Sequence, residues 1–75
     1  MTLYEYNALD LNNRMEIVNN KGTYLDTHAE LTERCLLYAI DMFFVEVVYD
    51  IELNKIIDIH SFKTGHLLNK YSNYL

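Results

Sequence analysis

Residues 34–50 have the sequence RCLLYAIDMFFVEVVYD, and the class of fold depends on whether they form two strands or one helix. If Asp41 and Met42 form a two-residue turn, Ile40 lies opposite Phe43, and the pairing continues outward from there. The second half, residues 43–50, is dense in β-branched and aromatic residues, which favour a pleated sheet. We therefore predict an antiparallel pair of strands whose facing residues share one side of a sheet.

A single helix over the same residues is the alternative. The apolar residues between Leu36 and Ile51 also follow a helical stripe. Residues 43–49, however, contain only one good helix former, Glu46. From the sequence alone both structures remain open, and the strand interpretation is the one developed below.

The N-terminal residues predict two short helices. Thr2 and Glu5 have the spacing of a capping box, which opens a helix that runs to about Ala8. Asp10 is a second N-cap, before a helix over residues 11–21 that Gly22 would end in a left-handed C-cap. We expect both helices to precede the sheet.

The remaining segments complete the predicted element order. Residues 23–27 are expected to form a short strand and residues 28–32 a polar connector. Residues 55–62 are expected to form a fourth strand, after a hairpin loop, and Thr64 to cap a C-terminal helix. The predicted fold is α+β, with an N-terminal helical segment, a four-stranded antiparallel β-meander and a C-terminal helix, in one domain over residues 1–75.

One register places the apolar residues of all three later strands on the same face. Asp50 opposite Ile56 puts Ile57 beside Tyr49 and Ile59 beside Val47, whereas a slip of one residue would bury Asp58 and His60. The predicted core is then Leu36, Tyr38, Ile40, Phe43, Val45, Val47, Tyr49, Ile57 and Ile59.

Composition and charge exclude several classes of protein. A chain that is 51% hydrophobic and 13% aromatic is a folded domain rather than a disordered tail. Residues 26–58 contain eight acids but only two bases, Arg34 and Lys55, so no basic stripe is available for nucleic acid or for anionic membranes. Because no membrane span or signal peptide is visible either, we expect a cytoplasmic protein.

The titratable residues do not form a recognisable metal or cofactor site. The single cysteine, Cys35, cannot form an internal disulfide. The histidines His28, His60 and His66 lack the convergent spacing of metal ligands. Glu46 and His60 are expected opposite each other on the outer face of the sheet, where a solvated charge pair is the expected role and a small enzyme the least favoured alternative. We expect no cofactor and no metal.

The outer face of the predicted sheet mixes acids with apolar residues, although a face that contacts water should be polar. We therefore predict a partner-binding surface made of Phe44, Glu46, Val48, Asp58, His60 and Phe62.

The expected function is a non-enzymatic protein–protein interaction module. Frequent Asn, Ile, Lys and Tyr, which have A/T-rich codons, point to a low-GC bacterium or its phage as the source. An inhibitor or regulator of a host defence nuclease, such as a CRISPR effector, is the most specific form of this expectation. The alternative is a structural domain that forms homodimers and has no specific ligand.

Three segments resemble a set of short uncharacterised bacterial proteins. These are residues 3–10 (LYEYNALD), 43–50 (FFVEVVYD) and 59–62 (IHSF). The resemblance extends over nearly the whole chain. It implies the order helix, β-meander, helix, and it implies no activity, cofactor or site.

Overall fold

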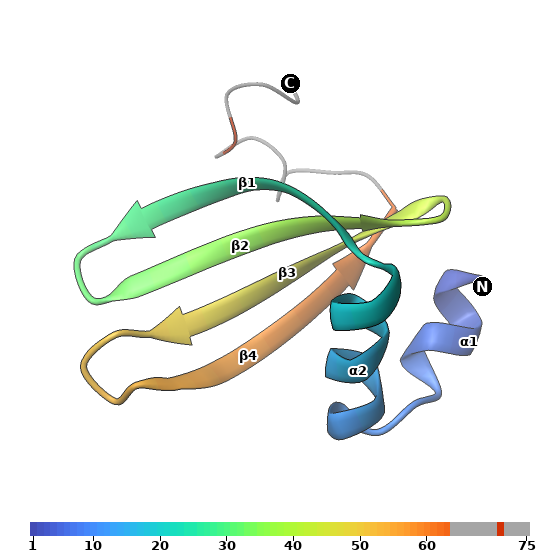
Figure 1. Ribbon diagram of the computed structural model, residues 1–75, viewed down its shortest axis with the longest axis horizontal. Coiled ribbons are helices and arrows are strands. Elements are labelled where there is room, and N and C mark those ends of the chain that lie inside the picture. Colours follow the sequence, from blue (N-terminus) through green and yellow to red (C-terminus); the bar gives the residue numbers. More distant parts are fainter. Residues whose placement is uncertain (64–70, 72–75) are drawn as a thin grey trace.

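Two helices precede a four-stranded antiparallel sheet in the computed structural model, which describes residues 1–63 and 71 (Figure 1). The elements are α1 (Leu3–Asn7), α2 (Leu11–Lys21), β1 (Thr23–Glu30), β2 (Glu33–Ile40), β3 (Phe43–Asp50) and β4 (Lys55–Phe62). The strands follow one another in the order β1-β2-β3-β4, which confirms the meander and the α+β class. The predicted C-terminal helix lies outside the described residues, apart from Tyr71.

The helix caps form where the sequence predicts them, with one difference. Thr2 and Glu5 make both hydrogen bonds of the capping box, and the Asp10 carboxylate accepts a hydrogen bond from the Asn13 amide at 2.8 Å. Gly22 caps the end of α2 in an extended conformation, with φ −74°, so the predicted left-handed cap is wrong. Glycine is needed there for space, because a Cβ would lie 2.5 Å from the Val18 carbonyl oxygen and 3.3 Å from the Tyr38 ring.

The pairing of β2 with β3 confirms the strand interpretation. Asp41 and Met42 form the turn, and Asp41 has a positive φ of 50°. Ile40 lies opposite Phe43, and the same register continues through Tyr38 and Val45 to Leu36 and Val47. The helical alternative for residues 34–51 is therefore wrong.

The first strand is longer than predicted. β1 continues through His28 to Glu30, where a polar connector was expected, and the turn to β2 is reduced to Leu31 and Thr32. The polarity of this segment misled the prediction, because β1 is an edge strand and none of its residues is fully buried.

A β-bulge in β4 corrects the predicted register at the far end of the β3–β4 hairpin. Val47 lies opposite Ile59 as predicted, but Tyr49 lies opposite Ile56, and the extra residue is Ile57. Ile57 is 41% exposed, so its assignment to the core is wrong. Ile56 lies on the same face as Tyr49, because the bulge reverses the alternation.

Each face of the sheet carries its own apolar cluster. Beneath the helices, Ile40, Phe43, Val45 and Val47 pack with Tyr6 and Val18. On the opposite face, which we call the outer face, Tyr71 packs with Cys35, Leu37, Val48 and Phe62. The described chain therefore has helices against one face of the sheet and Tyr71 against the other.

The helices cover only part of their face of the sheet. Figure 1 shows α1 and α2 at one end, beside the start of β1 and the ends of β2 and β4, while the other half of the strands extends away from them. At that far end the two remaining turns meet, since the Ile51 amide donates a hydrogen bond to the Thr32 carbonyl at 2.8 Å. The uncovered half of the helix-side face is the setting of the site described next.

Candidate functional site

The outer-face surface predicted from the sequence is largely buried within the chain. Glu46, Val48 and Phe62 have exposed fractions of 1%, 7% and 9%, and Phe44 is half-buried against the Phe62 ring. Asp58 is exposed and His60 is half-buried. A partner could therefore reach Asp58 and His60 directly, but the buried members of the predicted surface only after Tyr71 and its surroundings had moved.

Glu46 and Tyr71 form the polar centre of the outer face. The Tyr71 hydroxyl donates a hydrogen bond to the Glu46 carboxylate at 2.8 Å, and its ring packs edge-on against the His28 imidazole. Burial, and then the hydrogen bond to Glu46, raise the pKa of Tyr71 far above the usual range of a phenol. The buried carboxylate therefore holds Tyr71 on the sheet as a neutral donor.

His60 lies beside Asp58 on the outer face of the sheet. Its Nε2 lies 3.4 Å from Asp58 Oδ2, and both side chains are about half exposed. It also lies directly across the strand from Glu46, as predicted, but the Glu46 carboxylate accepts its hydrogen bond from Tyr71. A contact between two side chains this exposed contributes little to stability.

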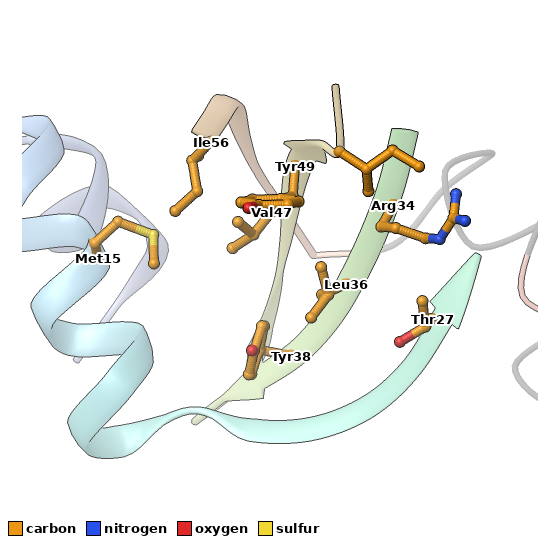
Figure 2. Close-up of a pocket in the computed structure, with 9 residues that line it drawn as sticks. Met15, Thr27, Arg34, Leu36, Tyr38, Val47, Tyr49 and Ile56 are labelled. Carbon is orange, nitrogen blue, oxygen red and sulfur yellow. The ribbon is translucent and has the colours of Figure 1, made fainter. Parts of the chain in front are cut away.

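An open hollow of about 400 Å³ lies on the opposite side of the sheet, between α2 and the uncovered ends of the strands. We call it the helix-side hollow. Figure 2 shows Met15 extending from α2 toward the sheet, with Val47 and Ile56 across from it. The lining residues are Met15, Thr27, Arg34, Leu36, Tyr38, Val47, Tyr49, Ile51 and Ile56.

The hollow is shallow, and its apolar surface continues beyond it. Ile51 and Ile56 are 44% and 39% exposed although they line it. Leu53 and Ile57, on the same hairpin, are also exposed. Apolar residues gathered in this way on a small domain are typical of an interaction surface.

The charges of the strands divide between the two faces. The register places six acids on the outer face: Asp26, Glu30, Glu33, Glu46, Asp50 and Asp58. Arg34 is the one charged strand residue of the described chain on the helix-side face, where it lies beside Tyr49 in the register. The helix-side hollow is thus apolar with a single cation at one end.

Sequence reasoning missed this hollow although it identified most of its residues. Leu36, Tyr38, Val47 and Tyr49 were predicted as core, and they do lie on one face. That α2 reaches only part of this face depends on how the helix packs, which no local pattern specifies. The one available signal was a difference in extent. The strands have eight residues each, and the eleven-residue helix lies across them, so it cannot cover their whole length.

Three further findings concern metal ions, membranes and known proteins. Among residues 1–63 and 71, no group of three or more His, Cys, Asp or Glu side chains is arranged to hold a metal ion. Neither described helix is long and apolar enough to cross a membrane. Comparison with protein-family models, with curated proteins and with solved structures finds no match for this chain.

Proposed function

We propose that the protein is a non-enzymatic protein-binding module that recognises its partner through the helix-side hollow. The observation that carries this proposal is the hollow itself, a concave surface lined by Met15, Leu36, Val47, Tyr49 and Ile56 that the chain's own helices leave open. Covering such a surface removes apolar area from water, which is the main favourable contribution to most protein association.

A protein segment fits this hollow better than a small molecule does. Pockets of about 300–1,000 Å³ hold small ligands, but they bury most of the ligand's surface. Here Ile51 and Ile56 keep more than a third of their own surface exposed, so a small ligand would stay half in water. A longer segment can cover the hollow and also contact Leu53 and Ile57, which are exposed on the β3–β4 hairpin.

Binding rather than catalysis agrees with the chemistry of the lining. Its polar groups are the Thr27 hydroxyl, the Arg34 guanidinium and the hydroxyls of Tyr38 and Tyr49. His60 lies opposite Glu46 in the register and beside Asp58 on β4, and it belongs to the other face. A module of this kind can act as an inhibitor or regulator by occupying a surface of a larger protein.

Photo-cross-linking in cells tests the proposal with a matched control. Ile56 and Asp58 lie two residues apart on β4, but Ile56 lines the hollow and Asp58 belongs to the outer face. With a photoreactive benzoyl-phenylalanine at position 56, we expect a covalent adduct with one protein, and with the same residue at position 58 we expect none. Adducts at position 58 alone would move the binding surface to the outer face and overturn the proposal.

A further inference from the structure

Arg34 provides the one charged side chain in the lining of the hollow. The side chain lies at the end of the hollow away from α2, with its guanidinium pointing away from that helix (Figure 2). It is half-buried, and its Nη1 donates a hydrogen bond to the Glu33 carbonyl at 2.9 Å. The guanidinium is therefore anchored at one nitrogen, while a guanidinium carries five N–H donors in all.

No carboxylate within residues 1–63 and 71 forms an ion pair with Arg34. The register places the six strand acids on the outer face, so the sheet separates their carboxylates from Arg34. Arg14 provides a contrast, since it uses Nε and Nη2 to bind the Leu9 and Asn7 carbonyls that close the loop between the helices. Arg14 has a structural role, and Arg34 retains donors for a ligand.

We propose, as an inference that rests on the proposed function, that the partner presents an amphipathic segment. Its apolar side chains fill the helix-side hollow, and its Asp or Glu carboxylate pairs with Arg34. A planar guanidinium at the rim of an apolar surface suits a carboxylate, which it binds through two parallel hydrogen bonds. The partly desolvated rim strengthens such a pair compared with one in open water.

A segment of another protein is favoured over a second copy of this chain. Each copy carries a net charge of −5, so two copies repel each other. The strand acids of a second copy also lie on its outer face, away from its own apolar hollow. A second copy could therefore not present one of its strand carboxylates and its own hollow from the same side.

Selection from random peptides displayed on phage, with the folded full-length protein as bait, tests the inference. We expect the selected peptides to combine apolar residues with an Asp or Glu, and their affinity to fall about tenfold or more with Arg34→Glu. Lys55→Glu, the same charge change on the outer face beside Asp50, is the control and should leave affinity unchanged. If Arg34→Glu fails to fold by circular dichroism, Arg34→Gln replaces it.

A charge swap and a blocked hollow separate the possible outcomes. A peptide with Lys in place of its acid should bind Arg34→Glu better than it binds the natural protein, a result that a purely structural role of Arg34 would not produce. If the peptides lose binding to Ile56→Glu but bind Arg34→Glu as tightly as the natural protein, this inference is overturned and the proposed function stands. Absence of any peptide sensitive to Ile56→Glu would contradict both. Self-association that Ile56→Glu abolishes, without peptide binding, would make a second copy the occupant and overturn the inference.

Discussion

Glu46 is a buried acid whose hydrogen bond holds a distant residue in place. It sits in the middle of β3, and Tyr71 donates to it across 25 positions of sequence. In a domain of 75 residues the apolar core is small, so one charge-assisted hydrogen bond is a substantial part of the total stability. Glu46 therefore acts in the fold, as the anchor of Tyr71.

Removing the Tyr71 hydroxyl should destabilise the protein measurably. We expect Tyr71→Phe to lower the free energy of unfolding by about 1.5–3 kcal/mol, the usual contribution of a hydrogen bond to a charged group. Urea denaturation followed by circular dichroism measures the change. Tyr4→Phe removes the same hydroxyl from an 85% exposed ring and should have almost no effect. Equal midpoints for the two variants would contradict the anchoring role.

The raised pKa of Tyr71 predicts that the protein loses stability at alkaline pH. The pKa of Tyr71 is raised in the folded protein by burial and by Glu46, so the unfolded chain ionises first, near its ordinary pKa of 10.0. The contribution of Tyr71 is therefore complete below pH 10 and decreases as the pH rises above it. Melting temperatures measured from about pH 9 to about pH 11, one unit on either side of the ordinary tyrosine pKa, should fall more steeply for the natural protein than for Tyr71→Phe.

At the scale of single elements, the β1–β2 turn contains a strained and exposed residue. Leu31 has a positive φ of 24° and is 99% exposed. A leucine there contributes no packing and adopts a backbone conformation that favours glycine or asparagine. We expect Leu31→Asn to raise the free energy of unfolding by about 1 kcal/mol. The midpoint of urea unfolding measures this, and Met42→Asn, in the β2–β3 turn, is a control at a position without a positive φ. A lower midpoint for Leu31→Asn would contradict the strain.

The bulge in β4 separates two positions that the apolar pattern treats alike. Val45 is fully buried, whereas Ile57 is 41% exposed at the bulge. We expect Val45→Asp to unfold the protein, because an unpaired charge in this core costs several kcal/mol, of the order of the whole stability. Ile57→Asp should leave a folded protein. Circular dichroism of both variants checks this, and loss of structure in Ile57→Asp would place that residue in the core.

For the whole molecule, the division of charge between the two faces predicts how binding depends on the acids. The strand acids of the outer face lie on the side of the sheet opposite the hollow, so we expect them to serve solubility rather than recognition. Glu30→Lys with Asp58→Lys should therefore change the association rate of the cross-linked partner no more than Glu5→Lys with Glu16→Lys, on the N-terminal helices. Stopped-flow kinetics at low and high salt compare the pairs. A selective, salt-sensitive slowing by the first pair would make the outer face a steering surface for a basic partner.

Local patterns were sufficient to predict the helix caps, the β2–β3 hairpin and most of the helix-side core. Thr2, Asp10 and the Asp41-Met42 turn act within a few residues of themselves, and the alternation of residues 43–50 has the period of a strand. The register of β2 and β3 follows from the same alternation, because a slip by one residue would exchange the two faces. These features depend only on interactions between residues that are close along the chain.

The site depends instead on contacts that no local pattern specifies. Four features arise from how finished elements pack together. These are the bulge at Ile57, the approach of Gly22 to Tyr38, the burial of Glu46 under Tyr71 and the open half of the helix-side face. Alternation shows that a residue belongs to a face, but what covers that face depends on the length and angle of the elements above it. The sequence by itself therefore determined the sheet and its two faces, and only the tertiary structure decided that the outer face is filled from within the chain while the helix-side hollow is left open.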